Sequence, residues 1–590
     1  MNNQATQVKK DSLDDKHTEA LVDAKPQEQI LNGSEILVKT LTDLGVDTIF
    51  GYPGGAVLPI YDKLYNNPDL NHILVRHEQG GTHAADGYAR ATGKPGVVLV
   101  TSGPGGTNTV TGIATAAIDS IPLVVFTGQV ATNLIGNDAF QEADIVGITR
   151  PITKHSYLVK DVNDLEYTIR EAFHIATTGK PGPVLIDLPK DMVMSKGHYT
   201  GNKTVNKRSY RPVTHGHHSQ IMKAADLLSN AKKPLIYAGG GVLLGKAWEE
   251  LTSFAERVNV PVTTTLMGLG CFPESKSQSL GMLGMHGTYY ANMAMTECDV
   301  LLAVGARFDD RVTGRVDGFS PNSRKIHIDI DPSCIAKNIP VEVPIVGDVK
   351  NVLPQLDNYT EKPDTKEWWD TLNKWKSDHP LQSPRAKDHI KPQHMIEAIS
   401  EVTKGEAVVV TDVGQHQMWA AQLYKYNHPR SFISSGGLGT MGYGFPAAMG
   451  AAIGNPDRPV FCISGDGGFQ MTIFELATCV QNNIPVKIAI MNNGYLGMVR
   501  QWQELFFDKR YSSVDLRDGN PDFVKLAEGY GAVGLRATTP EEMDEVLQKA
   551  MEINDRPVVM DIVVDREENC YPMVPAGAAL NEMVEGNSEQ

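Results

Sequence analysis

The stretch GDGGFQMTIFELATCVQNNIPVKIAIMNN, residues 465–493, predicts one β-α-β unit. The runs PVFCIS just before it and PVKIAIM within it are apolar and rich in β-branched residues, as in buried strands of a parallel sheet. Between them Ile473, Leu476, Ala477 and Val480 recur at helical spacing. Because such a unit is right-handed, its two strands end at the same edge of the sheet.

Asp466 and Asn493 follow these two strands, so both lie at the sheet edge where parallel sheets bind ligands. Their oxygens suit a hard cation such as Mg²⁺, with diphosphate oxygens and water as further ligands. The glycines let backbone N–H groups approach a phosphate, and a helix N-terminus adds a favourable dipole. No G-K-[ST] follows, so a nucleotide P-loop is not supported. Either motif alone is more often a simple turn, but their joint placement favours a metal-diphosphate site.

Composition limits the class of protein. The 590 residues suggest three or four domains, and the net charge of −16 argues against nucleic acid or an anionic membrane as partner. No apolar run is long enough to span a bilayer. The six cysteines form no C-x-x-C pair, which favours reduced thiols in a cytoplasmic protein. Residues 1–29 lack the apolar core of a signal peptide and read as a disordered polar tail.

The remainder alternates short β-branched runs with Ala-rich helical stretches. This pattern predicts an α/β fold of three domains whose mostly parallel sheets carry helices on both faces. The prediction places a polar tail at 1–29, domains at 30–193, 221–355 and 391–565, linkers at 194–220 and 356–390, and a final tail without strand signal at 566–590. Its strand candidates are 47–52, 72–77, 96–102, 123–128 and 183–187, then 234–242, 261–268, 299–310 and 325–332, and finally 407–414, 459–467, 486–493 and 558–565. The first and third domains share a rhythm that suggests related folds.

A second polar constellation lies in the first domain. Glu78 follows the strand candidate HILVRH and precedes a helix of small residues. A carboxylate at a helix N-terminus is stabilised by the helix dipole whatever its function, so spacing alone leaves a catalytic role open. The turn SGPGGTN, residues 102–108, also follows a strand and permits close backbone approach.

A glutamate in an N-terminal α/β domain, combined with GDG…NN in a C-terminal one, resembles the thiamine-diphosphate enzymes. The resemblance runs from about residue 33 to 580 and includes FQEADIVGITR, GARFDDRVTG, DVGQHQMW and MVRQWQ. These motifs are similar to those of the catalytic subunits of the acetohydroxyacid synthase (acetolactate synthase) family. The resemblance implies a pyrimidine-binding first domain, a central FAD-binding domain and a diphosphate-binding third domain. It also suggests that the tail 566–590 is an active-site lid.

The resemblance implies a carboligation. Pyruvate is decarboxylated, and the remaining hydroxyethyl unit is joined to a second pyruvate, giving 2-acetolactate, or to 2-oxobutyrate, giving 2-aceto-2-hydroxybutyrate. This is the first common step towards valine, leucine and isoleucine. Glu78 of one subunit would hydrogen-bond the aminopyrimidine of thiamine diphosphate bound by the other, which is general base catalysis through the cofactor. The implied assembly is a homodimer or tetramer with a separate regulatory small subunit.

The resemblance carries over a set of residues for thiamine diphosphate and its metal. Those for the cofactor are Gly55, Glu78, Gln415, His416, Gly439, Met441, Gly465, Asp466, Gly467, Gly468, Asn493 and Tyr495. Asp466, Asn493 and the backbone carbonyl of Tyr495 would bind Mg²⁺. A large apolar residue holds the cofactor bent in this family, and the sequence does not decide between Met418 and Met441.

The substrate channel implied by the resemblance contains Phe140, Gln141, Lys190, Arg311, Met498 and Trp502, next to Gly55. Arg311 can grip a carboxylate with two parallel bonds; the alternative is a surface ion pair with Asp309 or Asp310. Trp502 would size the pocket for the acceptor; its alternative is simple core burial.

The central domain is expected to bind FAD as a structural cofactor, since the ligation has no redox step. The implied FAD residues are Lys180, Gly239, Gly240, Gly241, Thr264, Leu266, Met267, Met285, His286, Gly305, Arg307, Asp309, Arg311, Asp329, Ile330 and Asp348. Two positions depart from the family pattern. Lys180 stands where relatives often have Arg, which puts that flavin contact in doubt, and Ala131 stands where many have Pro.

Other functions compete with this interpretation. A flavin-dependent pyruvate oxidase or another 2-oxo acid decarboxylase shares Glu78 and the Gly-Asp-Gly to Asn unit. A catalytically inactive regulatory homologue is disfavoured by intact Glu78, Asp466 and Asn493. The run HGHH, residues 215–218, resembles a metal motif but lies in a predicted linker without acidic or Cys partners.

Overall fold

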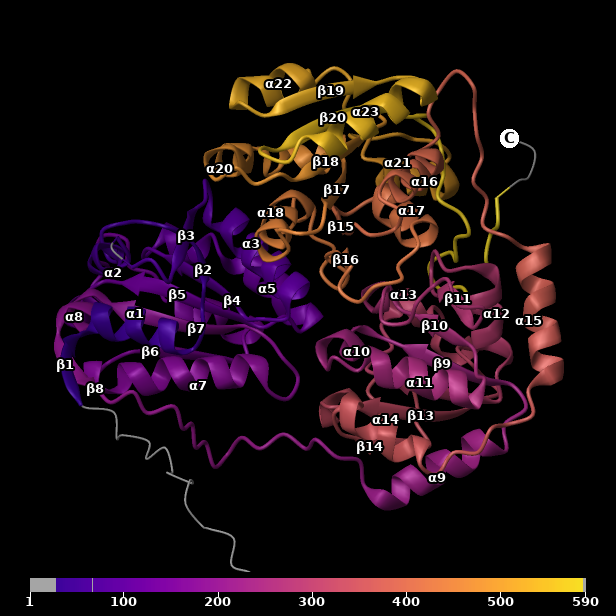
Figure 1. Ribbon diagram of the computed structural model, residues 1–590, viewed down its shortest axis with the longest axis horizontal. Coiled ribbons are helices and arrows are strands. Elements are labelled where there is room, and N and C mark those ends of the chain that lie inside the picture. Colours follow the sequence, from indigo (N-terminus) through magenta and orange to yellow (C-terminus); the bar gives the residue numbers. More distant parts are fainter. Residues whose placement is uncertain (1–27, 66, 587–590) are drawn as a thin grey trace, which may run out of the picture.

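The computed structural model describes residues 28–65 and 67–586 (Figure 1). The predicted polar tail, residues 1–29, therefore lies almost wholly outside the described residues. Three six-stranded sheets, each parallel throughout, form three domains, and this confirms the predicted fold class. A two-stranded antiparallel ribbon of β1 (Gln29–Asn32) and β8 (Lys196–Tyr199) closes the first domain.

The first domain contains the sheet β3-β2-β4-β5-β7-β6. Its strands are β2 (Thr48–Tyr52), β3 (Asn71–Leu74), β4 (Gly96–Val100), β5 (Leu123–Gln129), β6 (His155–Leu158) and β7 (Val184–Pro189). One face packs on α1 (Gly33–Asp43), α2 (Leu58–Leu64) and α7 (Leu165–Thr177), and the other on α3 (Glu78–Thr92) and α5 (Val110–Asp119). Glu78 begins α3, and Gly55 follows β2, so both lie beyond the carboxyl ends of the strands.

The central domain has the strand order β11-β10-β9-β12-β13-β14, which is the doubly wound order of dinucleotide-binding folds. The strands are β9 (Pro234–Ala238), β10 (Val262–Thr264), β11 (Ser279–Met282), β12 (Val300–Val304), β13 (Arg324–Asp329) and β14 (Val343–Val346). Helices α9 (His218–Ser229), α11 (Trp248–Val258) and α14 (Val349–Asp357) cover one face, and α12 (Tyr289–Glu297) and α15 (Lys366–Asp378) the other. The strand order reverses between β9 and β12, and such sheets bind ligands at that point.

The third domain has the sheet β16-β15-β17-β18-β20-β19. Its strands are β15 (Val408–Thr411), β16 (Phe432–Ile433), β17 (Val460–Gly465), β18 (Lys487–Asn492), β19 (Val533–Ala537) and β20 (Val558–Val563). Helices α18 (Gly444–Gly454), α20 (Leu476–Gln481) and α22 (Phe523–Tyr530) cover one face, and α16 (Pro392–Val402), α17 (Gln415–Leu423) and α23 (Pro540–Glu552) the other. Taken in chain order, its strands occupy the same places as those of the first domain, so these two domains share one topology.

The structure differs from the sequence interpretation in three details. The crossover between β17 and β18 is not one helix but α19 (Asp466–Gln470), the 3₁₀ turn η7 (Ile473–Glu475) and α20. Seven strands went unpredicted: both strands of the ribbon, β1 and β8, and five strands at the edges of the six-stranded sheets, β6, β11, β14, β16 and β19. The segments expected to be linkers contain β8 and α15, and the latter packs on the central domain.

Helices α3 and α18 join the first and third domains by a close backbone contact (Figure 1). A Cβ on Gly87 would overlap the carbonyl oxygen of Ala447, and a Cβ on Gly450 would overlap that of Ala84. The small residues of both helices therefore set the spacing between the two domains that carry the thiamine-diphosphate motifs.

Replacement of Gly450 by Ala tests this contact. Because the added methyl has no space, we expect Gly450→Ala to destabilise the protein by about 1–3 kcal/mol, the usual cost of overpacking. The midpoint of urea unfolding, followed by tryptophan fluorescence, measures the change. Gly529 in α22 is the control, because nothing lies within 4 Å of a Cβ placed there. Gly529→Ala should be neutral or slightly stabilising, and an equal loss in both variants would contradict the packing argument.

Candidate cofactor and active site

A small cavity of about 60 Å³ lies where β15, β17 and β18 end. Among the predicted cofactor residues, it is lined by Gln415, His416, Met441, Gly465, Gly467, Gly468, Asn493 and Tyr495. Three successive strand ends thus converge on one pocket, as the β-α-β argument requires. Gly439, with φ of +67°, lies in the loop that leads to Met441.

Asp466 is fully buried at the start of α19. Its Oδ2 accepts a hydrogen bond from Asn520 Nδ2 at 2.6 Å, whereas its Oδ1 has no hydrogen-bond partner among the described residues. Burial raises the pKa of this carboxyl to about 6. A bound divalent cation would satisfy the free oxygen and offset the cost of burying the charge, so the residues present fit Mg²⁺.

Asn493 and Tyr495 form the second side of this pocket. Asn493 Oδ1 accepts the Tyr495 N–H at 3.0 Å, and the Asn493 carbonyl accepts from Arg566 Nε at 3.1 Å. The side-chain oxygen keeps a second lone pair for a cation. No cluster of three or more His, Cys, Asp or Glu side chains suited to a metal occurs within residues 28–65 and 67–586, so HGHH gains no support.

Gln415 and His416 supply polar atoms to the diphosphate side. Gln415 Nε2 donates to Gln501 Oε1 at 2.8 Å, and its Oε1 lacks a partner in the described part of the chain, as does His416 Nε2. Burial lowers the pKa of His416 to about 4. The imidazole is therefore neutral near pH 7 and presents a polar atom, not a charge, to the pocket.

A larger cavity of about 870 Å³ lies at the switch point of the central sheet and is lined by all three domains. Of the predicted FAD residues, it is lined by Lys180, Gly239, Gly240, Gly241, Leu266, Met267, Met285, His286, Gly305, Arg307, Asp309, Arg311, Asp329, Ile330 and Asp348. Thr264 is the exception: it belongs to β10, and its neighbour Thr265 lines the cavity instead.

Glycines allow the loops of this cavity to pack tightly. A Cβ on Gly239 would strike the Gly305 carbonyl oxygen, and one on Gly241 would lie 2.6 Å from Gly305 Cα. The Gly241 N–H donates to the Gly305 carbonyl at 2.9 Å. The loops after β9 and β12 can therefore meet only with glycine at these positions, which leaves the space beyond them for a dinucleotide.

Lys180 lines the large cavity with its ammonium held by two neighbouring side chains. Its ammonium lies 3.2 Å from Asp331 Oδ2 and 3.3 Å from Cys334 Sγ, and both residues follow β13 in the chain. These partners restrain the ammonium at the cavity wall. A lysine here donates as a point charge and lacks the fork of an arginine.

His286 presents an acceptor to the cavity. Burial lowers its pKa to about 4, so the ring is neutral, and its Nδ1 lies 3.1 Å from the Pro572 carbonyl. Because that carbonyl can only accept, Nδ1 carries the proton and Nε2 has a free lone pair. Nε2 has no partner among the residues described. Pro572 belongs to the C-terminal tail, which thereby supports the cavity wall.

The predicted channel residues Arg311, Met498 and Trp502 line the large cavity. Arg311 is mostly exposed, and its ion pair with Asp310 spans 3.7 Å between exposed side chains. Such pairs contribute little, so the guanidinium remains free to bind a carboxylate. Trp502 is only half-buried, which excludes simple core burial as its explanation. Met418 and Met441 both line this cavity, and Met441 also lines the small one.

The two cavities adjoin each other. Their shared lining residues are Val413, Gly414, Met441, Met498 and Val499. A diphosphate in the small cavity and a dinucleotide in the large one would therefore be separated by little more than Met441 and its neighbours.

Apart from Lys180, the candidate residues of the first domain line neither cavity. These residues are Gly55, Glu78, Phe140, Gln141 and Lys190. Glu78 is buried and accepts a hydrogen bond from Asn108 Nδ2 at 2.9 Å, whereas Phe140 is 88% exposed. One copy of the chain thus brings together the diphosphate and dinucleotide pockets but not the glutamate.

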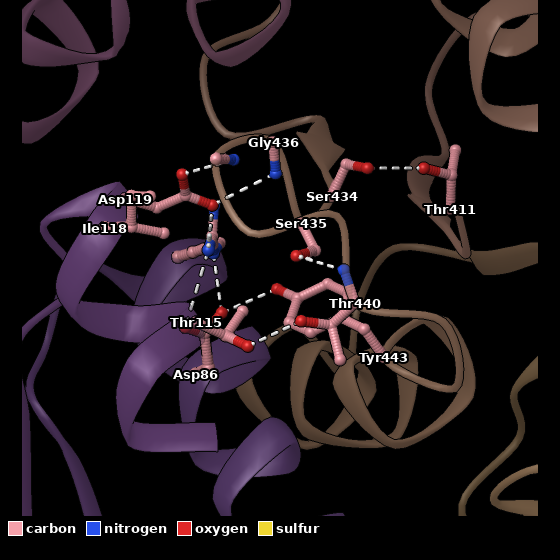
Figure 2. A network of polar contacts seen from close by, with 12 residues as sticks. Asp86, Thr115, Ile118, Asp119, Thr411, Ser434, Ser435, Gly436, Thr440 and Tyr443 are labelled. Atoms are coloured by element: carbon pink, nitrogen blue, oxygen red, sulfur yellow. Dashed lines mark hydrogen bonds and ion pairs between the residues drawn. The ribbon is translucent and has the colours of Figure 1, made fainter. Parts of the chain in front are cut away.

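A buried polar network fixes the loop that separates the cavities (Figure 2). Asp119, at the end of α5, accepts the backbone N–H groups of Gly436 and Gly437 at 3.1 and 2.9 Å. Asp119 also forms an ion pair with Arg90 at 3.0 Å, and Arg90 in turn pairs with Asp86. The loop from Gly436 leads directly to Gly439 and Met441. No motif pointed to Asp119 or to Asn520, because neither stands in a characteristic spacing.

Comparison with known proteins gives the same picture. The N-terminal, central and C-terminal domain families of thiamine pyrophosphate enzymes match residues 31–148, 221–356 and 412–562. This is the class that the three domains and the diphosphate pocket define. The chain is 51% identical to the acetolactate synthase large subunit of Haemophilus influenzae, covering 94% of this chain and 98% of the relative.

Two further relatives are similar over the same share of this chain. The large subunit of acetolactate synthase isozyme 3 from Escherichia coli is 48% identical, with 98% of its length covered, and the large subunit from Corynebacterium glutamicum is 50% identical, with 90% covered. The chain therefore belongs to the acetolactate synthase large-subunit family of thiamine-diphosphate-dependent enzymes.

The Asp119 network predicts a large loss of stability when it is broken. Asp119→Ala leaves two backbone N–H groups without their acceptor and Arg90 short of one partner. Removal of one member of a buried ion pair costs about 3–5 kcal/mol. The urea midpoint should fall accordingly. Lys94→Ala is the control, because the Lys94–Asp47 pair is about half exposed and such pairs contribute roughly 0–1 kcal/mol. Similar losses of stability in the two variants would contradict the claim that the buried network stabilises the protein more than an exposed ion pair does.

Proposed function

We propose that the protein decarboxylates pyruvate and ligates the two-carbon unit to a second pyruvate or to 2-oxobutyrate. The observation that carries this proposal is the junction of the two cavities. Buried Asp466, with one carboxylate oxygen unpartnered among the described residues, stands between Gly465 and Gly467 of the small cavity, and the glycine-lined switch point forms part of the large one. The products would be 2-acetolactate and 2-aceto-2-hydroxybutyrate, at the start of branched-chain amino-acid synthesis.

Thiamine diphosphate would supply a nucleophilic carbon that adds to the 2-oxo group and accepts electrons when CO₂ leaves. In this chain Asp466, Asn493 and the Tyr495 carbonyl hold its Mg²⁺. Gln415 and His416 would lie beside the diphosphate, since both line this pocket. Met441, between the cavities, packs against the cofactor.

FAD fits the large cavity as a structural cofactor. Two molecules of pyruvate give one acetolactate and one CO₂ without net oxidation, so the ligation needs no electron acceptor. Asp329 lies after β13 and Asp348 after β14, and both line the cavity, where they can accept hydrogen bonds from a ribose. Lys180 and Arg307 bring positive charge to the same wall.

The site is completed by a second copy of the chain. Glu78, Gly55, Phe140, Gln141 and Lys190 belong to the first domain and line neither cavity of their own chain, which supports their use in the partner's site. Glu78 would hold the proton that activates the cofactor's aminopyrimidine. A homodimer is the smallest assembly that meets this requirement, and a tetramer is a pair of such dimers. The relatives are named large subunits, which supports a separate small regulatory subunit.

Substrates would enter along the wall that carries Arg311 and Trp502. Arg311 would bind the substrate carboxylate, and Trp502 would limit the acceptor pocket. The tail from residue 566 is described to residue 586. Its Pro572 contacts His286 and its Val574 contacts Met285, which supports a role for this tail as a lid of the active site. Across the described residues, no helix has the length and apolar character needed to cross a bilayer. A cytoplasmic location is part of the proposal.

Product analysis tests the reaction. Purified protein with thiamine diphosphate, Mg²⁺ and FAD should convert pyruvate to 2-acetolactate without an added electron acceptor. With pyruvate and 2-oxobutyrate in competition, both acetohydroxy acids should form, as measured by mass spectrometry. Acetate that forms only with an electron acceptor would instead identify a pyruvate oxidase, and acetaldehyde a decarboxylase.

Mixing of two inactive variants tests the shared site. Glu78→Gln and Asp466→Asn should each abolish most turnover, and Glu78→Gln should leave FAD content unchanged. In dimers reassorted at random, half are hybrids with one intact site each, so about a quarter of wild-type activity should return. Activity no higher than the mean of the two parent variants would place Glu78 and Asp466 in a site built by one chain.

A further inference from the structure

Glu475 lies in the turn η7 of the crossover between β17 and β18, and no motif assigned it a role. Its side chain is fully buried. Both carboxylate oxygens accept the backbone N–H of Arg76 at 3.1 Å, and Oε1 also accepts the N–H of His77 at 3.1 Å. Thr478 Oγ1 donates to Oε2 at 2.6 Å. A side chain of the third domain thus holds the backbone of the first.

The two N–H groups belong to the residues directly before Glu78. His77 is the N-cap of α3, and its Nδ1 accepts the Gln79 N–H at 3.1 Å. The carboxylate of Glu475 therefore fixes the turn from which Glu78 begins the helix. A Cβ on Gly80 would overlap Glu475 Oε1, so glycine at this position is required for the contact.

A carboxylate is suited to this place for electrostatic reasons. Burial raises the pKa of Glu475, and hydrogen bonds from Thr478, Arg76 and His77 oppose that shift. The dipole of α3 favours a negative charge at its N-terminus. The Arg76 guanidinium turns away to the Leu74 carbonyl and Gln481. An apolar side chain here would leave two buried N–H groups without acceptors.

We propose that Glu475 is a positioning residue for Glu78: its carboxylate sets the 76–77 backbone so that Glu78 is presented to the aminopyrimidine of the cofactor. This inference rests on the role of Glu78 in the proposed function. Glu475 follows Asp466 in the same crossover, so the unit that binds one diphosphate also orients the glutamate of a second site.

The test uses Glu475→Gln in the full-length protein loaded with thiamine diphosphate, Mg²⁺ and FAD. The amide keeps the size of the side chain but places N–H donors against the donors of Arg76, His77 or Thr478. The readout is the exchange of the cofactor's C2 proton for deuterium without substrate, measured by NMR after an acid quench. A small misplacement of a catalytic group can lower a rate on the order of 10²-fold, and a loss of that size is expected. The dissociation constant for thiamine diphosphate should stay close to wild type.

A matched control separates positioning from simple loss of a buried interdomain bond. Glu274 is a half-buried glutamate, and its Oε2 accepts the Tyr426 N–H at 2.9 Å, which joins the central and third domains. Glu274→Gln should lower stability but leave the exchange rate unchanged. Glu475→Asp keeps the charge with a shorter reach and should restore part of the exchange lost in Glu475→Gln.

A second variant reaches the same contact from the other side and covers the case in which Glu475→Gln does not fold. Gly80→Ala pushes against Glu475 Oε1 and should also slow exchange. The effects of Gly80→Ala and Glu475→Gln should not add in the double variant, because both act through one contact.

The outcomes distinguish the inference from the proposed function. Slow exchange in Glu78→Gln with normal exchange in folded Glu475→Gln and Gly80→Ala would overturn the positioning role. A loss of exchange that merely follows weaker cofactor binding would also overturn it. Normal exchange in Glu78→Gln would instead remove Glu78 from the mechanism and leave the proposed function at fault.

Discussion

The right-handed connection between parallel strands is the constraint on which this structure depends. It brings the carboxyl ends of neighbouring strands to one edge, so that residues far apart in sequence come together there. Asp466 and Asn493 follow the paired strands β17 and β18 in the third domain, and Gly239 and Gly305 follow the paired strands β9 and β12 in the central domain. In each sheet the ligand pocket lies where the strand order reverses, because the helices leave the edge in opposite directions there.

This constraint also explains how much the sequence could predict. Strands within each sheet are buried on both faces and read as unbroken apolar runs, such as VVLV in β4. The strands that escaped prediction lie at sheet edges, where one side meets solvent and the apolar signal fades. In β19, for example, four of five residues are exposed or half-buried. The three domains and the convergence of Asp466 with Asn493 were accessible from sequence because they depend on periodicity and chain direction alone.

Contacts between domains were not accessible in the same way. Asp119 and Glu475 accept hydrogen bonds from backbone groups of another domain, 317 and 399 residues away. Their role depends on how α3 and α18 dock, and no local pattern encodes that docking. The glycines at the helix contact were visible in the sequence, but their requirement appears only when a Cβ is set against the opposing carbonyl. Only Gly80 carried a signal in the sequence. It precedes a second glycine within a helix, and glycines destabilise helix interiors unless a close contact requires them.

In the proposed function a flavin would serve a reaction without net electron transfer, and the large cavity offers a physical reason for it. Protein interiors are close-packed, and a space of about 870 Å³ between three domains leaves its lining side chains without packing partners. One part of that lining is the loop from Gly436 to Met441. Asp119 binds the start of this loop, and Met441 at its end also lines the diphosphate pocket. A flat, rigid ligand in this space would support the loop from the other side. A flavin bound there would thus hold the neighbouring cofactor pocket in shape, an effect that needs no redox chemistry.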